Sequence, residues 1–239
     1  MRTTKFYKSF EKKSKRNFLI LLAAIAGVAI FIIYFTVTLP YFYVKDIQIK
    51  GLNRLSYSDI LQSSSISPKI SIFKLNLAGI SKKIQYELIM VRKVIIRRKL
   101  PSTLVIEIEE RAPYVYVKKE EKIWEVDEEG VVLGEVEKLN SLTRVTGVDP
   151  FKEKNFLLKA LKALNFSQAL DLRVEKITIN KGNEGIVLIL EKDIQVILGT
   201  SPNYHYLSYL PDVLEDAKKR GEKFNQVDLR FEEQIVVSK

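Results

Sequence analysis

The longest uninterrupted apolar stretch of the chain lies near its N-terminus. It runs from Phe18 to Leu39, and none of its 22 residues is charged. At about 1.5 Å per residue, a helix of this length crosses the roughly 30 Å hydrocarbon core of a bilayer. It is longer than the apolar region of a secretory signal peptide, and no small-x-small cleavage site follows it. The pattern therefore predicts a retained transmembrane helix over residues 18–39.

Beyond this run, polar and apolar positions alternate and then change period. Residues 44–51 (VKDIQIKG) alternate as a half-buried strand does. Two helical patterns follow, one over 56–64, where Ser56 and Asp59 are spaced as in a capping box, and one over 77–88. Two further alternating runs close the segment. The order strand, helix, helix, strand, strand predicts a small domain over residues 40–112, with both helices on one face of a three-stranded sheet.

The last two runs of this domain, VIIRRK and TLVIEIEE, are basic before Pro101 and acidic after it. If their apolar positions share the buried face, the register of a hairpin is fixed. Ile96 then pairs with Ile106 and Val94 with Ile108, while Lys93 opposes Glu109 and Arg97 lies diagonal to Glu107. We therefore interpret the split charge as cross-strand pairing on a solvated sheet face, without a catalytic role for the carboxylates.

From residue 113 onward, short strands and turns dominate the pattern. Strand-like runs at YVYV, KIWEVD and VVLGEV precede a helix through KEKNFLLKALKAL. RVEKITIN, GIVLILEK and IQVILGT give three more strands, and a last helix is expected from about Asn203 to Lys219, ending at Gly221. NQVDLRFEEQIVVSK supplies one or two closing strands. Residues 113–239 are thus expected to form a mixed sheet with helices on one side and Trp124 in its core, which makes the exported part an α+β protein.

The net charge of +10 is concentrated at the N-terminus. Residues 1–17 carry seven basic side chains and one acidic one, whereas the rest of the chain carries 32 basic and 28 acidic ones. Positive charge on one side of a membrane span keeps that side in the cytoplasm. The sequence therefore predicts a single-pass plasma-membrane protein with residues 1–17 inside and the bulk of the chain outside. The basic segment is interpreted as a topology signal with affinity for the lipid bilayer, and no nucleic acid partner is expected.

The residue types exclude several kinds of chemistry. The absence of cysteine rules out disulfides, thiolate metal sites and a cysteine nucleophile, and the single histidine, His205, rules out a multi-histidine metal site. No cofactor and no small-molecule substrate are expected. A membrane-tethered cell-wall hydrolase is an alternative, and its best site would be His205, Ser208 and Asp212 on one face of the predicted last helix. No G-x-S-x-G or comparable nucleophile setting accompanies them.

Several segments together resemble the bacterial cell division family FtsQ, called DivIB in some groups. They are the basic head with its single anchor, VKDIQIKGLNRLSYSDIL, RRKLPSTLVIEIEERAP, IWEVDEEGVVL, GIVLILEKDIQVILGT and VDLRFEEQIVV. The first exported domain is similar to the POTRA domain of the FtsQ type. The resemblance implies a protein without enzymatic activity that acts as a scaffold at the division septum.

The resemblance also implies partners and a binding region. Proteins of this family link early division proteins to FtsB and FtsL, and through them to the septal peptidoglycan synthases. Their second domain binds the FtsB–FtsL pair largely through its terminal strand region. Carried over to this chain, the partner-binding residues are Asp228, Leu229, Arg230, Phe231, Gln234, Ile235, Val236 and Val237.

The residues of this terminal region allow two interpretations. A closing strand at a sheet edge would offer unpaired backbone groups to a partner, and an arginine beside a phenylalanine is typical of an interface anchor. Alternatively, the segment DLRF is a buried ladder, with Leu229 in the core and Arg230 paired to an acid. POTRA domains also occur in envelope assembly and secretion factors, which usually carry several copies and a β-barrel, so this function is a further alternative.

Overall fold

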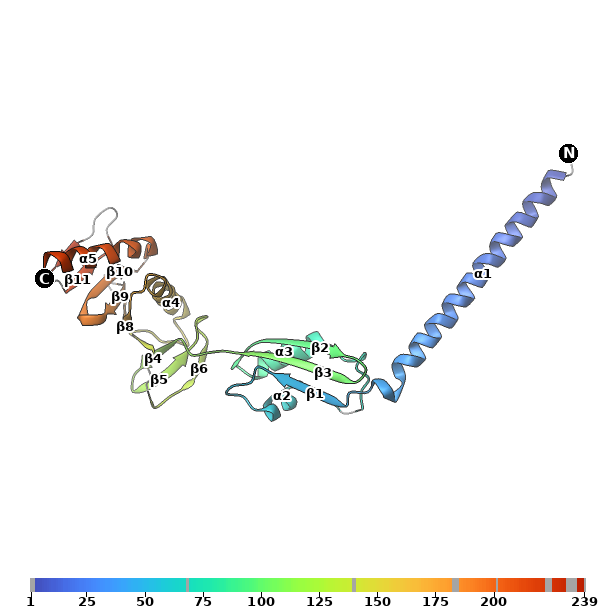
Figure 1. Cartoon of the computed structure of the whole chain (residues 1–239), viewed down its shortest axis with the longest axis horizontal. Coiled ribbons are helices and arrows are strands. Elements are labelled where there is room, and N and C mark those ends of the chain that lie inside the picture. The colour runs from blue at the N-terminus through green and yellow to red at the C-terminus, as the bar shows by residue number, and fades with distance from the viewer. Residues whose placement is uncertain are drawn as a thin grey trace. The chain divides into compact units, whose positions relative to one another are not determined.

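The computed structural model describes residues 3–67, 69–138, 141–181, 185–200, 202–221, 225–230 and 236–238 (Figure 1). The chain divides into two compact units, Met1–Glu110 and Arg111–Lys239.

The first element is a single long helix, α1 (Thr3–Thr38). The predicted membrane span over 18–39 falls on it, and its side chains at positions 33 and 36–38 lie outside the described residues. Among the residues that the structure describes, no helix combines the length and hydropathy needed to cross a membrane. A short 3-10 helix, η1 (Pro40–Phe42), follows α1. The membrane anchor therefore stays a prediction from the sequence.

The rest of the first unit is a three-stranded sheet with two helices. Its elements are β1 (Asp46–Lys50), α2 (Tyr57–Ser64), α3 (Leu77–Glu87), β2 (Val91–Lys99) and β3 (Thr103–Glu110). The sheet order is β1-β3-β2, with β1 parallel and β2 antiparallel to β3. Ile60 of α2 and Ile84 of α3 share one buried cluster with Val94 and Ile106 of the sheet, so both helices cover the same face. The predicted order of elements is confirmed.

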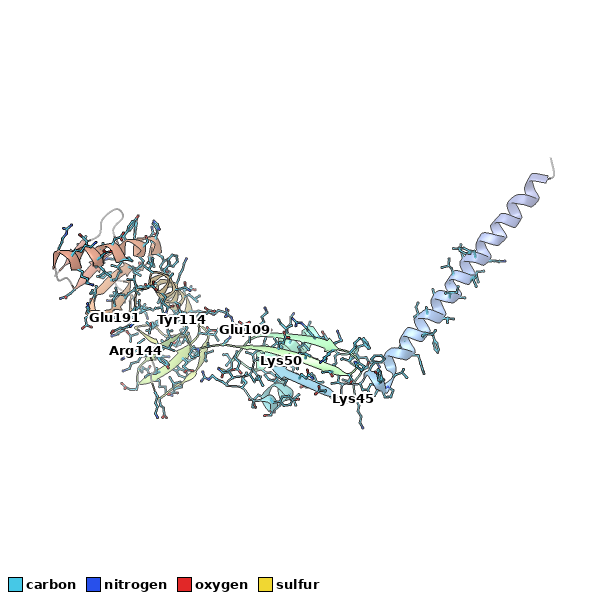
Figure 2. All side chains as sticks on the ribbon, viewed as in Figure 1. Lys45, Lys50, Glu109, Tyr114, Arg144 and Glu191 are labelled. Atoms are coloured by element: carbon cyan, nitrogen blue, oxygen red, sulfur yellow. The ribbon has the colours of Figure 1, made fainter. Side chains whose placement is uncertain are left out.

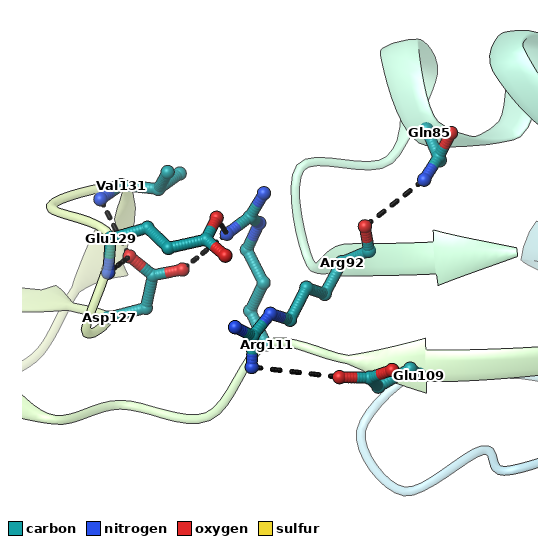
Figure 3. Close-up of polar contacts among 7 residues, drawn as sticks. All are labelled: Gln85, Arg92, Glu109, Arg111, Asp127, Glu129 and Val131. Carbon is teal, nitrogen blue, oxygen red and sulfur yellow. Dashed lines mark hydrogen bonds and ion pairs between the residues drawn. The ribbon is translucent and has the colours of Figure 1, made fainter.

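The β2–β3 hairpin has the register that the alternation predicts. Ile96 lies opposite Ile106, Val94 opposite Ile108 and Lys93 opposite Glu109. On the outer face, Nη1 of Arg97 lies 3.0 Å from Oε1 of Glu107, and Nη1 of Arg92 lies 3.6 Å from Oε1 of Glu109 (Figure 3). Lys50 and Glu109, near the ends of β1 and β3, are labelled in Figure 2. Solvent-exposed pairs of this kind contribute about 0–1 kcal/mol each, so the buried apolar face sets the register.

Two side-chain caps hold the loops of the first unit. The capping box at the start of α2 is confirmed, because Ser56 Oγ accepts from the Asp59 N–H and Asp59 accepts from the Ser56 N–H. At the end of β3, the Glu110 carboxylate accepts the backbone N–H groups of Asn53, Arg54 and Leu55 at 2.8, 2.8 and 3.0 Å. Partial burial opposes ionisation of Glu110, but these three hydrogen bonds outweigh it and lower its pKa.

The second unit contains a mixed sheet, two α-helices and two 3-10 helices among its described residues. Its elements are β4 (Val115–Lys119), β5 (Lys122–Val126), β6 (Val132–Glu135), β7 (Thr143–Thr146), α4 (Lys154–Ala169), β8 (Val174–Asn180), β9 (Gly185–Leu190), η2 (Glu191–Asp193), β10 (Gln195–Gly199), η3 (Tyr204–Tyr209), α5 (Leu210–Arg220), β11 (Gln226–Asp228) and β12 (Val236–Ser238). The nine strands have the order β12-β11-β10-β9-β8-β7-β4-β5-β6. Parallel pairs join β4 with β7, β7 with β8, and β10 with β11. The predicted mixed sheet is therefore present.

The core of the second unit lies between the sheet and α4. Leu157, Ala160, Leu161 and Leu164 of α4 are all at most 3% exposed and pack against strand residues such as Ile177. Ser167, on the same buried face, donates to the Ala163 carbonyl and so leaves no unpaired hydroxyl in the core. The 3.6-residue spacing of these apolar positions explains why this segment forms a helix against a sheet.

The start of the second unit is tied to the β5–β6 turn by a partly buried ion cluster. Arg111 contacts the carboxylates of Asp127 and Glu129, the latter at 2.7 Å (Figure 3). Asp127 is 3% exposed, and its Oδ1 also accepts the N–H groups of Glu129 and Val131. A buried carboxylate needs such partners, so Arg111 and the turn hold one another in place.

Three sequence expectations for the second unit need correction. The strand β7 was not predicted, because TRVT contains a single aliphatic residue, although it pairs with both β4 and β8. The last helix is not continuous over 203–219, because Pro211 cannot supply a helical N–H and the α-helix begins at Leu210 after a 3-10 segment. Trp124 is half-buried and packs edge-on against Phe151, which is 54% exposed. Its strand is next to the sheet edge, whereas α4 packs along β8.

The β9–β10 turn holds two consecutive residues in the left-handed region. Lys192 has φ 66° and Asp193 has φ 60°. The turn is closed by the Leu190 N–H, which donates to the Ile194 carbonyl at 2.9 Å. Left-handed backbone suits Asp and Asn but crowds the Cβ of other residues, so Lys192 carries local strain.

We predict that Glu110→Gln weakens the loop at residues 53–55. Because the pKa of Glu110 is lowered in the folded state, its contribution to stability is present above about pH 4.5 and is lost as the pH falls through the folded pKa. Hydrogen exchange of the 53–55 amides should be faster in the variant at neutral pH and should approach wild type in acid. Equal exchange in both proteins at neutral pH would contradict this role, and Glu107→Gln on the same strand is the control.

We predict that Lys192→Asn and Lys192→Val shift stability in opposite directions. Asn tolerates left-handed backbone and Val does not, so the two variants should differ by about 1–2 kcal/mol in the free energy of unfolding. Urea unfolding followed by Trp124 fluorescence measures the difference. The same Lys→Val change at Lys176, in the extended strand β8, should not destabilise the protein.

Candidate partner-binding site at the C-terminal edge of the sheet

The C-terminal strands form one end of the nine-stranded sheet. β10 pairs with β11 in parallel, and β11 pairs with β12 antiparallel, with Val227 opposite Val237 and Asp228 opposite Val236. The Leu229 N–H donates to the Ile197 carbonyl at 2.9 Å and so continues the β10–β11 ladder past the end of β11. β12 is therefore the edge strand at this end.

An ion pair between Asp228 and Arg230, two positions apart, fixes the end of β11. Arg230 Nε lies 2.9 Å and 3.0 Å from the two carboxylate oxygens of Asp228, and Arg230 Nη2 lies 2.5 Å from Oδ2. The Arg230 N–H also donates to Asp228 Oδ1 at 3.1 Å. These hydrogen bonds outweigh partial burial and lower the pKa of Asp228. The Asp228 side chain is 9% exposed and that of Arg230 is 30% exposed, so the arginine covers the carboxylate and faces solvent.

Two glycines let the chain pass closely at this end of the sheet. Gly199, at the end of β10, has φ +79° and lies beside Gly185 of β9. A Cβ added to Gly199 would lie 3.2 Å from Cγ of Arg230. The aliphatic part of Arg230 therefore lies over Gly199, which a larger residue would disturb.

The predicted site residues fall into three groups. Asp228 and Leu229 are buried, at 6% and 3% exposure, so their side chains hold the strand in place, as the alternative interpretation of DLRF expects. Arg230 is exposed, and so is Val236, at 46%. Val237 is placed by its backbone pairing with Val227. Phe231, Gln234 and Ile235 lie outside the described residues. Among the predicted site residues whose side chains are described, Arg230 and Val236 are therefore the exposed ones.

The residues of the hydrolase alternative are not arranged as a catalytic triad. His205 and Ser208 lie in η3, whereas Asp212 belongs to α5. The Ser208 hydroxyl donates to the His205 carbonyl at 2.7 Å, and the His205 ring packs edge-on against Tyr209. A nucleophile must instead be hydrogen-bonded to its base. Within the described part of the chain, no three His, Asp or Glu side chains are grouped as a metal site requires.

Comparisons with known proteins agree with both folded units. Residues 42–111 match the family "POTRA domain, FtsQ-type", and residues 115–230 match "Cell division protein FtsQ/DivIB, C-terminal". The chain is 27% identical over 212 residues to the cell division protein DivIB of Clostridium tetani, covering 83% of this chain and 80% of that protein. It is 25% identical over 211 residues to the cell division protein FtsQ of Corynebacterium glutamicum, covering 86% of this chain and 90% of that protein.

A solved structure is also similar to part of the chain. It is the major extracytoplasmic domain of DivIB from Geobacillus stearothermophilus, with 14% identity and a TM-score of 0.34, and the match covers 48% of this chain and 99% of that one.

A POTRA domain of the FtsQ type followed by this C-terminal domain defines a class of bacterial cell division proteins. The chain belongs to the FtsQ/DivIB family.

We predict that Arg230→Ala lowers the free energy of unfolding by about 1–3 kcal/mol, because it leaves the Asp228 carboxylate without its charged partner. Arg230→Lys keeps the charge but loses the bidentate geometry, so its loss should be smaller. Urea unfolding followed by Trp124 fluorescence measures both variants. Equal stability of wild type and Arg230→Ala would show that the ion pair contributes nothing to holding β11.

Proposed function

We propose that this protein is a division scaffold without enzymatic activity, anchored in the plasma membrane by residues 18–39. In this proposal residues 1–17 lie in the cytoplasm, and residues 40–112 and 113–239 form two exported domains at the septum. The second domain binds an FtsB/FtsL-like pair and so links it to septal peptidoglycan synthesis. Membership of the FtsQ/DivIB family supports the division role. The observation that carries the binding mode is the edge position of β12.

The edge at β2 of the first unit is protected by a helix. α3 packs along β2, and its side chains reach the strand backbone. Ser81 Oγ donates to the Val94 carbonyl at 2.9 Å, and Gln85 Nε2 donates to the Arg92 carbonyl at 3.0 Å (Figure 3). The register of β2 also shifts between Val91 and Lys93. Covered and irregular edges disfavour the addition of another strand.

The edges at β1 and β6 have their own protection. β1 exposes Asp46, Gln48 and Lys50 at alternate positions, and the Tyr57 hydroxyl donates to its Ile47 carbonyl. β6 ends at the charged residue Glu135, and its pairing with β5 shifts register between Glu125 and Val126. Charged positions and bulges are the usual means by which natural sheets block edge pairing.

β12 differs from these three edges. Its described residues, Val236 to Ser238, carry no charge and no proline, and they pair with β11 without a register shift. An extended partner segment would add to this edge through main-chain hydrogen bonds, and the side chains of Arg230 and Val236 would contact it. Asp228 and Leu229 would act indirectly, because they hold β11 and therefore β12 in place.

We predict that proline substitution separates binding from folding at β12. Adjacent residues of an edge strand point their N–H groups to opposite sides, so one of Val236 and Val237 faces β11 and the other faces outward. Proline at the outward position should abolish binding of the organism's own FtsB/FtsL-like pair to the full-length protein while Trp124-monitored stability stays at the wild-type value. Proline at the other position should lower stability.

The binding experiment uses detergent-solubilised full-length protein and biolayer interferometry with the immobilised pair. Tyr57→Pro, at the first position of α2 in the first unit, is the control, because proline fits the first turn of a helix and the residue before it, Ser56, is extended. No binding of the pair by wild type, or unchanged binding by both β12 variants, would contradict the proposal.

A further inference from the structure

Two neighbouring segments of the second unit are free of acidic residues. Neither 154–169, which forms α4, nor 194–211, which contains β10 and η3, has an aspartate or glutamate. Together they hold three lysines, Lys154, Lys159 and Lys162, and the histidine His205. In a chain with 29 acidic residues, this composition makes the surface where they meet basic.

The two segments are joined through Tyr204 of η3. Its hydroxyl donates to the Lys159 carbonyl at 3.1 Å, and its ring stacks on Phe166 with 5.5 Å between centroids and 14° between planes. Nζ of Lys162 lies 4.8 Å from the centre of the Tyr204 ring. Phe166 is 41% exposed and Lys162 is exposed. We call the residues Lys159, Lys162, Phe166 and Tyr204 the α4–η3 surface.

The lysines of this surface differ in what they contact from three other lysines of the same unit. Lys119, Lys122 and Lys181 form ion pairs with Asp149, Glu135 and Glu153 at the surface. Lys159 instead donates to the Thr200 carbonyl at 2.7 Å, and Lys162 lies over the Tyr204 ring. Among the residues that the structure describes, no carboxylate pairs with either ammonium, so this surface favours the approach of a carboxylate.

The α4–η3 surface and the candidate site on β11 both reach the end of β10. Lys159 is bonded to Thr200, which directly follows Gly199, and Gly199 lies under the aliphatic part of Arg230. Val227 and Leu229 lie in the core cluster with α4, so the alternation of β11 places Asp228 and Arg230 on the other face of the sheet. Lys159 and Arg230 therefore approach the end of β10 from opposite faces, and a partner segment would pass around this end of the sheet to reach the lysines.

We infer that the partner segment which pairs with β12 continues onto the α4–η3 surface, where its carboxylates face Lys159 and Lys162 and an apolar side chain packs on Phe166 and Tyr204. This inference rests on the proposed strand addition at β12. It specifies the partner's chemistry: an extended segment flanked by an acidic stretch that contains an aliphatic or aromatic residue. Aromatic side chains beside cations are typical of interface anchors.

The test measures binding of the organism's FtsB/FtsL-like pair to full-length Lys162→Glu protein. The expected result is about a tenfold or greater loss of affinity, mainly through a slower association rate, together with a weaker dependence of affinity on salt. Lys154→Glu is the matched control, since it makes the same charge change at an exposed position at the start of the same helix. It should bind within about twofold of wild type. Phe166→Gln should speed dissociation.

The outcomes separate strand addition at β12 from binding at the α4–η3 surface. If wild type does not bind the pair, or both β12 proline variants bind it normally, strand addition itself fails. If wild type binds and the outward-facing proline abolishes binding, but Lys162→Glu keeps wild-type affinity and salt dependence, the α4–η3 surface is not part of the interface. An equal loss in Lys154→Glu and Lys162→Glu would indicate a general charge effect and would also overturn the inference.

Discussion

The hydrogen bonding of sheet edges is the constraint on which this protein depends. A sheet that does not close leaves a row of backbone N–H and C=O groups at each end, and these groups must be covered, hydrated or paired. Among the described strands, the two sheets end at β1, β2, β6 and β12. Side chains from α3, alternating polar residues and register shifts protect the first three. The fourth edge has none of these features, and it lies in the unit where the family's C-terminal domain is found.

The regular pairing of β12 depends on its neighbour, β11. β11 has only three paired residues, so strand pairing alone fixes it weakly. Its position is held by Leu229 in the core, by the Leu229 N–H on the Ile197 carbonyl, and by the bidentate pair of Asp228 with Arg230. The same arginine lies over Gly199 and thereby links the edge to β10. These contacts fix β11, and β11 in turn holds β12 by strand pairing. The outer edge of β12 is therefore a fixed row of backbone groups.

The sequence predicted those features whose causes lie within one segment or in two segments that are adjacent in sequence. The β2–β3 register followed from alternation, because a shift by one residue would expose Ile96 and Ile106 together. The capping box at Ser56 and Asp59 followed from spacing alone. Trp124 and β7 could not be placed in this way. Whether Trp124 is covered depends on where α4 lies. The strand character of TRVT depends on pairing with β4 and β8, two strands that are far apart in the sequence.

The α4–η3 surface was likewise hidden from inspection of the sequence. Tyr204 lies 38 positions beyond Phe166 in the sequence, and no motif joins it to the three residues on α4. Only the fold brings an acid-free helix beside an acid-free loop. Both segments lack aspartate and glutamate, but this shared feature has a meaning only when the fold makes the two segments neighbours.

Strand addition and charge complementarity act on different aspects of recognition. Main-chain hydrogen bonds at β12 would be the same for any extended segment, so they provide affinity without discrimination. In the proposed interface, side chains would therefore have to select the partner. The basic and aromatic α4–η3 surface would supply this selectivity, because it favours an acidic flank and opposes a basic one. Selectivity of this kind would depend on charge rather than on shape, and it would tolerate sequence drift in the partner as long as the carboxylates stay within reach of Lys159 and Lys162.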